Sequence, residues 1–456
     1  MDRFDFAVIG AGAAGEAAAN AALERGRSVV VIDRDLFGGS CAFWACIPSK
    51  SLLHGAGEHR HGYTWPHASD RRDYMINRES RDYPDDSSHV KALEDAGAKT
   101  LRGDARIVGP GEIEVRPTGG DAPIRISART IIVATGSRPQ MPDIEGLADT
   151  HPWTNVEATS TRELPRSIVV LGGGATGVEL ASVFARFGVE TSLVHAHDRL
   201  LDKDHARSGE AAARILRDEG VELRLGERAA KVRPCAWNDE THVVELSDGG
   251  FVEGERIVVA LGRKFDLGNL GLENVGVETG RLKPDGRLRI ADDVYLIGDP
   301  AGPELFTHVG HYQGGLAVRM SLGEDVEPDY RAIPRAVFLD PEIASVGPDV
   351  DQAKAAGIDA LEFVADFATT ARGYGLEAKF GHLAIVVDQR VGTLVGASVV
   401  APDASAAIHE ATLAIHAQTP MKTLASMIHA FPSTSRGFDG LYAQAVGKLY
   451  GVKVPA

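Results

Sequence analysis

Short apolar runs, separated by glycine-rich turns and alanine-rich stretches, set the pattern of this chain from its first residues. Residues 4–9 are almost wholly apolar and predict a buried strand. A glycine-rich turn follows, and an alanine-rich helix is expected to about residue 25. A second apolar run, residues 28–32, ends at Asp33. This order of strand, turn, helix and strand predicts a βαβ unit.

The same pattern returns in the middle of the chain. Residues 167–171 predict a strand, a second glycine turn follows, and a helix to about residue 187 leads into a strand over 190–194. Asp33 lies 23 positions after Gly10, and the same step from Gly172 reaches His195. The sequence therefore predicts two copies of one nucleotide-binding unit.

Each glycine of the first turn has a separate physical role. Gly10 allows the tight turn, Gly12 lets backbone N–H groups approach a pyrophosphate, and Gly15 lets the helix pack closely on the strand. Asp33 can accept hydrogen bonds from a ribose. The matching positions of the second turn are Gly172, Gly174 and Gly177. Two such units predict a tightly held flavin dinucleotide and an exchanging nicotinamide dinucleotide.

The second unit carries a histidine where the first carries its acid. A carboxylate would repel a 2′-phosphate, whereas His195, His197 and Arg199 could attract one, which favours NADP over NAD. The alternative is that these side chains lie on a solvated loop. Asp198 and Asp202 weaken the case for a cationic site.

Two further segments fit a flavin domain. Residues 130–136 read as a strand that ends in a turn. Residues 294–299 read as a strand that ends at Asp299, which could hold a hydroxyl of the ribityl chain. Taken alone, each segment could be only a strand followed by a turn.

Cys41 and Cys46 form a C-x₄-C pair. Residues five apart in a regular helix have Cα atoms about 8–9 Å apart, whereas a disulfide needs less than about 7 Å. A bridge therefore requires non-helical geometry between them and would tend to be reducible. The alternatives to a reducible disulfide are buried inert thiols, a structural bridge, a chance spacing and a zinc site. Zinc is disfavoured and no metal is expected, and Cys235 is a solitary thiol.

Composition narrows the class of protein. The chain has 456 residues, 44% of them apolar, and a formal net charge of −16, which argues against a nucleic-acid partner. No apolar run reaches the roughly 18 residues of a membrane span. The first residues lack the basic segment of a signal peptide. A cytoplasmic protein without a membrane partner is therefore expected.

The cysteine segment and its surroundings resemble the flavoprotein disulfide reductases, the family of lipoamide dehydrogenase and glutathione reductase. The resemblance follows the family order along nearly the whole chain. It includes both glycine turns, the cysteine pair, Gly262-Arg263, Gly298-Asp299 and residues 338–347. It implies an α/β fold with two Rossmann-like domains and a C-terminal α+β dimerisation domain, with FAD and NADP, or NAD, as cofactors.

The resemblance also implies roles for individual residues. Cys46 would face the flavin and Cys41 would attack the substrate, while Lys50 and Glu179 match an ion pair beside the flavin. The positions that match flavin contacts are Ser40, Thr135, Gly136, Asp299 and Thr307.

The chain departs from the family at the catalytic base. Family members read His-Ala-His-Pro-Thr-x-x-Glu near the C-terminus, and the second histidine is the base that serves the partner subunit's cysteines. Here Phe431 occupies the position of the base and Arg436 that of the acid that orients it. Without the base, thiol exchange would lose a factor of about 10²–10⁴. His429 matches the outer histidine, and either packing or a proton relay remains open for it.

Three functions stay in competition. The leading hypothesis is an FAD-dependent NAD(P)H oxidoreductase that passes electrons through Cys41–Cys46 to a small disulfide or thiol-reactive substrate. The second is reductive cleavage of a C–S bond without protonation, since 2-ketopropyl-coenzyme M oxidoreductase/carboxylase also resembles this chain in its cysteine segment and in a phenylalanine at the base position. The third is a flavin-binding homodimer with vestigial activity.

Domain boundaries follow from the order of these motifs. We expect the FAD domain over residues 1–150, the nicotinamide domain over 151–270, a central region that completes the FAD domain over 271–331, and the dimerisation domain over 332–456. Residues 60–86, rich in charge and aromatic side chains, are expected as a solvated connection or, alternatively, as a partial cover over the thiols.

Overall fold

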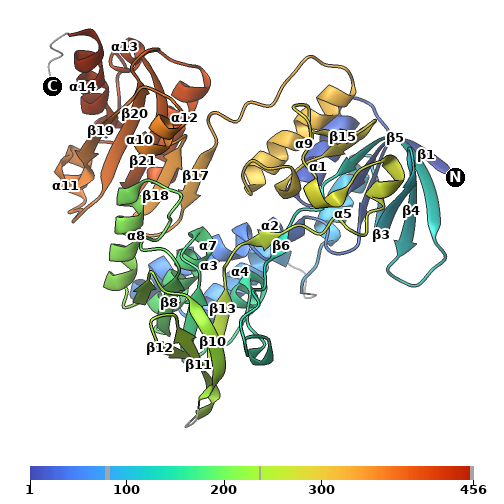
Figure 1. Ribbon diagram of the computed structural model, residues 1–456, viewed down its shortest axis with the longest axis horizontal. Coiled ribbons are helices and arrows are strands. Elements are labelled where there is room, and N and C mark those ends of the chain that lie inside the picture. Colours follow the sequence, from blue (N-terminus) through green and yellow to red (C-terminus); the bar gives the residue numbers. More distant parts are fainter. Residues whose placement is uncertain (78–82, 236–237, 452–456) are drawn as a thin grey trace. The chain divides into compact units, whose positions relative to one another are not determined.

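A computed structural model describes residues 1–77, 83–235 and 238–451 (Figure 1). The chain divides into two compact units, and each is described separately. Unit 1 comprises residues 1–51, 69–140 and 262–329; unit 2 comprises residues 52–68, 141–261 and 330–456. Within the described residues, no helix combines the length and apolarity that crossing a membrane requires.

Unit 1 is built on a mixed sheet whose parallel centre is the first βαβ unit. β1 pairs in parallel with β2 and β5, β2 pairs with β3, and β16 pairs with β5, while β4 and β15 run antiparallel to their neighbours. The strands are β1 (Asp2–Ile9), β2 (Val29–Asp33), β3 (Lys99–Gly109), β4 (Glu112–Pro117), β5 (Ile124–Val133), β15 (Arg289–Ala291) and β16 (Val294–Leu296). The strands from 289–296 thus join the sheet begun at the N-terminus.

Small residues let two helices of unit 1 approach closely. α1 (Ala13–Leu23) packs against α9 (Thr307–Ser321), shown in blue and yellow in Figure 1. A Cβ on Gly314 would lie 2.5 Å from the carbonyl oxygen of Ala14, so only glycine fits there. The alanine-rich sequence of α1 therefore serves this close contact as well as helix formation.

Two of the other helices of unit 1, α2 and α3, carry the motif cysteines, and the segments next to two of the crossings between the units pair with each other. β6 and β14 form a two-stranded antiparallel ribbon where the chain leaves and re-enters the unit. These elements are α2 (Gly39–Phe43), α3 (Cys46–Glu58), α4 (Trp65–Asn77), α5 (Ser87–Asp95), β6 (Arg138–Pro139), β14 (Arg263–Lys264) and the 3₁₀ turns at Leu272–Val275, Thr279–Arg281 and Asp299–Ala301. The residues of α3 from Leu52 onward, and the first residues of α4, belong to unit 2.

The second βαβ unit forms the first half of unit 2. β13, β7, β8 and β9 make a parallel sheet in that order, and β10, β11 and β12 make an antiparallel sheet. The elements are α6 (Asn155–Ser160), β7 (Ser167–Leu171), α7 (Ala175–Arg186), β8 (Glu190–His195), α8 (Ala206–Asp218), β9 (Glu222–Leu225), β10 (Ala229–Cys235), β11 (Asn238–Leu246), β12 (Phe251–Gly254) and β13 (Arg256–Val259).

The C-terminal half of unit 2 is an antiparallel sheet covered by helices. Its strand order is β17, β18, β21, β20 and β19, and α12 packs on β18 and β21. The elements are β17 (Pro334–Val337), β18 (Glu342–Val346), α10 (Val350–Ala355), β19 (Ala360–Asp366), α11 (Ala371–Gly375), β20 (His382–Asp388), β21 (Thr393–Ala401), α12 (Ala404–His416), α13 (Met421–Leu424) and α14 (Phe438–Tyr450). The expected α/β fold with a C-terminal α+β domain is confirmed, while the proposed domain boundaries stay predictions.

Candidate functional site

The first glycine turn is shaped for close approach to a ligand. Gly10 has φ +108°, and a Cβ there would lie 2.3 Å from the carbonyl oxygen of Ala134. A Cβ on Gly15 would lie 1.9 Å from the carbonyl oxygen of Gly10. Gly12 caps α1, and a Cβ on it would meet nothing closer than 3.9 Å, so the turn is open beside this residue. This cradle, at a helix N-terminus, fits the pyrophosphate of a dinucleotide.

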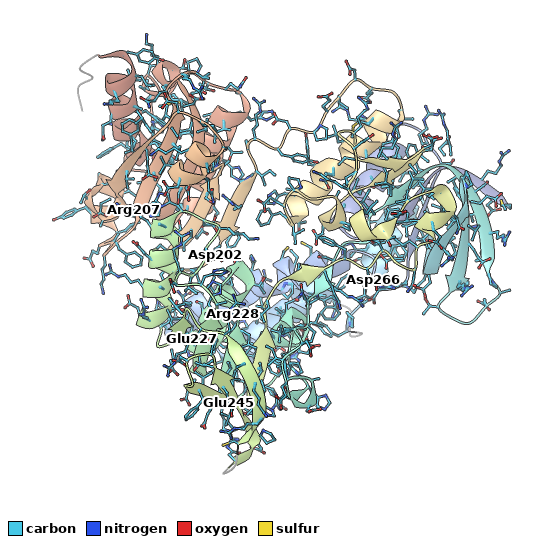
Figure 2. All side chains as sticks on the ribbon, viewed as in Figure 1. Asp202, Arg207, Glu227, Arg228, Glu245 and Asp266 are labelled. Atoms are coloured by element: carbon cyan, nitrogen blue, oxygen red, sulfur yellow. The ribbon has the colours of Figure 1, made fainter. Side chains whose placement is uncertain are left out.

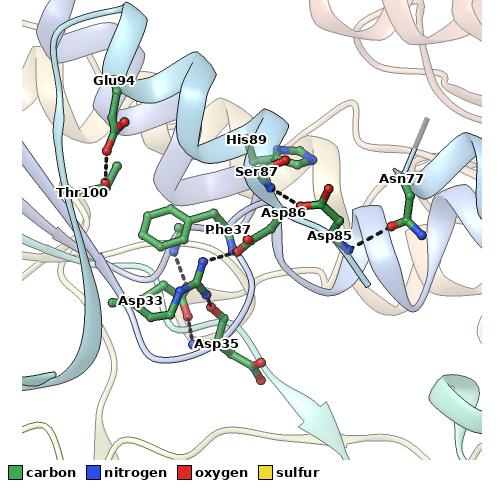
Figure 3. Close-up of polar contacts among 12 residues, drawn as sticks. Asp33, Asp35, Phe37, Asn77, Asp85, Asp86, Ser87, His89, Glu94 and Thr100 are labelled. Atoms are coloured by element: carbon green, nitrogen blue, oxygen red, sulfur yellow. Dashed lines mark hydrogen bonds and ion pairs between the residues drawn. The ribbon is translucent and has the colours of Figure 1, made fainter. Parts of the chain in front are cut away.

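Asp33 holds this turn from the end of β2 (Figure 3). One carboxylate oxygen accepts the backbone N–H of Ala11 at 2.6 Å, and the other accepts that of Asp35 at 2.8 Å. Burial raises the pKa of Asp33 despite these bonds. The carboxylate thus shapes the turn, and it retains lone pairs with which it could also accept from a ribose.

A supporting cluster beside Asp33 could not be read from the sequence (Figure 3). Asp86, which lies just before α5, accepts the backbone N–H of Phe37 at 2.7 Å and pairs with Arg102 at 2.6 Å. The Arg102 guanidinium lies 5.1 Å from the centre of the Phe37 ring. Residue 86, at the end of the expected connection 60–86, therefore fixes the loop after β2.

Asp299 belongs to a network that sequence reasoning also missed. Ser137 donates a hydrogen bond to the Asp299 carboxylate, and Arg263 donates to the Ser137 hydroxyl at 2.5 Å and to its carbonyl at 2.7 Å. The buried Gln313 side chain of α9 accepts the N–H of Gly298 at 2.8 Å and donates to the Gly302 carbonyl at 2.5 Å. These contacts fix the carboxylate expected to bind the ribityl chain.

The two motif cysteines lie on different helices, because the chain is not helical between them. Cys41 is on α2, Cys46 begins α3, and Trp44 has φ −130° and ψ −3°. Both are thiols in this structure and both are partly exposed. The Cys46 sulfur lies 3.4 Å from the hydroxyl oxygen of Thr307, the first residue of α9. A break of this kind is what a bridge across C-x₄-C requires.

The environment of the pair makes the two thiols unequal. The pKa of Cys46 is lowered to about 6, chiefly by the hydrogen bond from Cys41; the Thr307 hydroxyl and the Lys50 ammonium also lower it, and burial acts against them. The same hydrogen bond, together with burial, raises the pKa of Cys41. In the reduced pair, Cys46 is therefore the thiolate and Cys41 keeps the proton.

Of the remaining positions expected around the flavin, all but Glu179 lie in unit 1. Ser40 is exposed in the first turn of α2, Thr135 is exposed after β5, and Gly136 follows it with φ +64°. Lys50 lies in unit 1, whereas Glu179 lies on α7 of unit 2, where its carboxylate accepts the backbone N–H of Phe338 at 3.0 Å. The ion pair between Lys50 and Glu179 therefore stays a prediction.

The second glycine turn repeats the geometry of the first. Gly172 has φ +118°, a Cβ on Gly177 would lie 1.8 Å from the Gly172 carbonyl oxygen, and Gly174 caps α7 with open space around it. Gly262, with φ +116°, follows the end of β13. The cradle at the N-terminus of α7 fits the pyrophosphate of a second dinucleotide.

His195 contacts the backbone of the second glycine turn. Its side chain is buried, and the backbone N–H of Gly173 donates to its Nδ1 at 3.1 Å. Burial lowers the pKa of His195, so the ring is neutral at neutral pH. A neutral ring gives no charge attraction to a 2′-phosphate, and contact between His195 and the nucleotide stays a prediction. Gly173 was missed too: a Cβ on it would meet the His195 ring at 2.7 Å.

The other residues of this loop carry mixed charge. Asp202, labelled in Figure 2, lies 3.6 Å from the His195 ring and 4.0 Å from that of His197. The Arg199 guanidinium donates to the Asp202 backbone carbonyl at 2.8 Å. A preference for NADP then rests on His197 and Arg199 alone, against the nearby carboxylate of Asp202.

The C-terminal segment presents Phe431 and immobilises His429. Phe431 is 74% exposed. The His429 Nε2 lies 3.0 Å from both oxygens of Glu410, and its Nδ1 pairs with Asp439, which also pairs with Arg436. The side chain of His429 is only 5% exposed. Of the two roles left open for His429, the structure favours packing, because both ring nitrogens contact carboxylates.

Comparisons with known proteins agree with this geometry. The sequence pattern of the family described as pyridine nucleotide-disulphide oxidoreductase matches residues 4–314, and the pattern of its dimerisation domain matches residues 333–441. The chain is 32% identical over 466 residues to the dihydrolipoyl dehydrogenase of Halobacterium salinarum, covering 97% of this chain and 96% of that protein. It is 31% identical over 448 residues to the dihydrolipoyl dehydrogenase of Bacillus subtilis, covering 94% and 93%.

Solved structures give the same result. The Cu(II) complex of RclA, an HOCl-induced flavoprotein disulfide reductase from Escherichia coli, is 26% identical, with a TM-score of 0.86 over 97% of this chain and 100% of that chain. LpdA from Mycobacterium tuberculosis is also 26% identical, with a TM-score of 0.86 over 97% and 99%. Among the described residues, no group of three or more metal-ligating side chains is placed to hold a metal ion.

Proposed function

This chain belongs to the pyridine nucleotide-disulphide oxidoreductase family, and we propose that it reduces a small disulfide or other thiol-reactive substrate through Cys41 and Cys46. As a family member it is an NAD(P)H-dependent flavoprotein oxidoreductase that uses FAD. The dimerisation pattern over residues 333–441 indicates a homodimer. The finer proposal rests on one observation, the unequal pair of thiols beside Thr307.

The residues present fit both cofactors. The turn from Gly10 to Gly15, with Asp33 and Asp299, would hold FAD, and the turn from Gly172 to Gly177 would hold the nicotinamide dinucleotide. When bound, the flavin supplies the two-electron chemistry that links the nicotinamide to the disulfide. Cys46 holds negative charge after reduction, since its neighbours favour the thiolate. Cys41 is the thiol left to attack the substrate.

A spectroscopic experiment tests this proposal. Anaerobic titration of the holoenzyme with NADH or NADPH should produce a long-wavelength band from charge transfer between the Cys46 thiolate and the flavin. Cys46→Ser should abolish the band while the flavin stays bound, and Val243→Ala, on β11 of unit 2, serves as a control for unspecific loss. An unchanged spectrum in Cys46→Ser would remove Cys46 from the electron path. A panel of disulfides, with analysis of the products, would then identify the substrate class.

A second function is favoured by one observation. Phe431 is exposed at the position of the family's base, and the nearby His429 is held by Glu410 and Asp439. A site without that proton donor suits reductive C–S cleavage in which the product carbanion meets an electrophile such as carbon dioxide. With a thioether substrate, Phe431→His should shift the products toward the protonated form. Unchanged partitioning between products would count against this second function.

A further inference from the structure

The reduced thiol pair contains a proton with no assigned acceptor. Cys46 is the thiolate, and the pKa of Cys41 is raised by its hydrogen bond to Cys46 and by burial. A thiol attacks a disulfide only as the thiolate, so Cys41 must lose its proton before it reacts. Phe431 cannot accept a proton, and His429 contacts carboxylates through both ring nitrogens.

Two exposed histidines, His308 and His311, lie on the helix that reaches the thiols. α9 begins at Thr307, whose hydroxyl lies 3.4 Å from the Cys46 sulfur. His311 follows four positions later, so it shares a helical face with Thr307, at a Cβ separation of about 5–6 Å. Cα–Cβ bonds of a helix tilt toward its N-terminus, which directs the His311 ring toward Thr307 and the thiols.

The surroundings of His311 leave the ring available. The buried residues of α9 pack on its other face, toward α1, and both Thr307 and His311 are exposed. Within the described part of the chain, the structure gives His311 no hydrogen-bond or ion-pair partner. His308 points to a different side of α9, because it is one residue after Thr307, and its ring stacks on Phe306 at 5.2 Å.

We propose that His311 accepts the proton of Cys41 and returns it to the substrate, which replaces the base that Phe431 displaces. This inference rests on the proposed disulfide reduction. Among the charged groups of this part of unit 1, Lys50 on α3 acts on Cys46, Glu304 lies just before α9, and Glu16 on α1 is paired with His89 at 2.8 Å. Histidine is the side chain best suited to exchange protons near neutral pH.

The reaction balances as follows. The Cys41 S–H gives its proton to the His311 ring, and the Cys41 thiolate attacks the substrate disulfide. The substrate S–S bond breaks, a Cys41–substrate disulfide forms, and the departing thiolate takes the proton from His311. The Cys46 thiolate then attacks the Cys41 sulfur, which re-forms the Cys41–Cys46 disulfide and releases the second substrate thiolate to be protonated by water. The cysteine pair is oxidised and the substrate is reduced.

Alkylation of the reduced enzyme tests this inference without a substrate or a nicotinamide. The holoenzyme is reduced with dithiothreitol, exchanged into iodoacetamide over a series of pH values, and the alkylation of Cys41 is followed by mass spectrometry. In the wild type, the rate of alkylation of Cys41 should rise with pH. His311→Gln should slow alkylation of Cys41 at pH 7 by about tenfold to 10²-fold and move the rise to higher pH. Added imidazole should restore part of the rate.

His308→Gln is the matched control and should leave the profile unchanged. Flavin absorbance and the size of the particle establish that each variant is folded, and His311→Asn provides a second variant of the same exposed position. A His311→Gln profile identical to that of the wild type, or equal effects in His308→Gln, would overturn the inference. The alkylation experiment uses dithiothreitol as the reductant, so it does not depend on NAD(P)H. A failure of electron transfer from NAD(P)H to the cysteines would therefore appear only in the charge-transfer titration that tests the proposed function.

Discussion

The two glycine turns solve the same backbone problem with different side chains. In the first, the Asp33 carboxylate accepts the N–H of Ala11 at 2.6 Å; in the second, the His195 ring accepts the N–H of Gly173 at 3.1 Å. In both, the acceptor lies 22 residues after the donor, at the end of a parallel strand. Both residues at this position accept a hydrogen bond from the turn, although one is a carboxylate and the other a neutral imidazole.

This difference affects how the residue at the end of each strand, Asp33 or His195, is interpreted in terms of nucleotide selectivity. An acid or a histidine at the end of the strand is required by the turn, whichever nucleotide binds. Charge selectivity must then come from the neighbouring residues, which in the second unit include His197, Arg199 and Asp202. The experiments below separate the role in the turn from the role in recognition.

Filling the third glycine of each turn should give the largest effect. In Gly15→Val and Gly177→Val, the new Cβ would lie 1.9 Å and 1.8 Å from a carbonyl oxygen, so strand and helix must separate. We expect Gly15→Val to lose bound FAD, with affinity at least 10²-fold weaker. Gly177→Val should keep FAD but lose reduction by NAD(P)H. Absorbance spectra and anaerobic reduction distinguish the two variants, with dithionite as the control reductant.

A weaker effect is expected when the acceptor of either turn is removed. Asp33→Ala and His195→Ala leave the N–H of Ala11 or Gly173 without its partner, at a loss of about 1–3 kcal/mol. Asp33→Asn retains an acceptor oxygen and should lose less stability than Asp33→Ala. Thermal unfolding followed by flavin fluorescence measures the difference. Equal stability of Asp33→Asn and Asp33→Ala would show that the hydrogen bond from Ala11 to residue 33 does not stabilise the protein.

Removing the charge of Asp202 should alter selectivity at the second turn alone. Asp202→Asn takes away the carboxylate beside His195 and His197, so a 2′-phosphate meets less repulsion. We expect the ratio of NADPH to NADH affinity to rise about tenfold, equivalent to roughly 1.4 kcal/mol, and to respond to salt. Glu222→Gln, on β9, is a control of equal charge change. If the ratio of NADPH to NADH affinity is unchanged, the 2′-phosphate does not bind close to Asp202.

The smallest effect is a difference in pH response. The pKa of His195 is lowered by burial, so its contribution to stability is present above its ordinary value of 6.5 and lost as pH falls below it. The pKa of Asp33 is raised by burial, so stability declines as pH rises from 3.8 through its folded pKa. His195→Asn and Asp33→Asn should each remove one of these opposite slopes in melting temperature against pH. If His195 and Asp33 contribute slopes of the same sign to the melting temperature against pH, the opposite pKa shifts assigned to them are wrong.

Much of the fold and part of the site could be predicted from local patterns. The strand at 4–9 lies inside β1 (Asp2–Ile9), and the strand at 167–171 coincides with β7. The glycine turns were recognisable because a positive φ or a close carbonyl excludes other residues, as at Gly10 and Gly172. The order of strand, glycine turn and helix is local in sequence, so it could be recognised, although the carbonyls that exclude a Cβ at Gly10 and Gly172 belong to the distant Ala134 and Ala260.

The rest depended on contacts between distant segments. Ser137 and Arg263 are 126 residues apart, and their network with Asp299 has no local signature. Burial lowers the pKa of His195, and Glu410 and Asp439 contact the ring nitrogens of His429; neither effect is visible in a motif. Residue charge and proton transfer are set by tertiary surroundings, so these roles were the ones that could not be assigned beforehand.

The most direct test of the account is the absorbance of the oxidised Cys41→Ser holoenzyme as a function of pH. This variant cannot form the bridge, so Cys46 stays free, and a serine hydroxyl can still donate to it. The account predicts a charge-transfer band without any reductant, present above a pH near 6 and lost below it, in line with the lowered pKa of Cys46. No band at any pH, or a band that also persists in Cys46→Ser, would contradict the assignment of Cys46 as the thiolate beside the flavin.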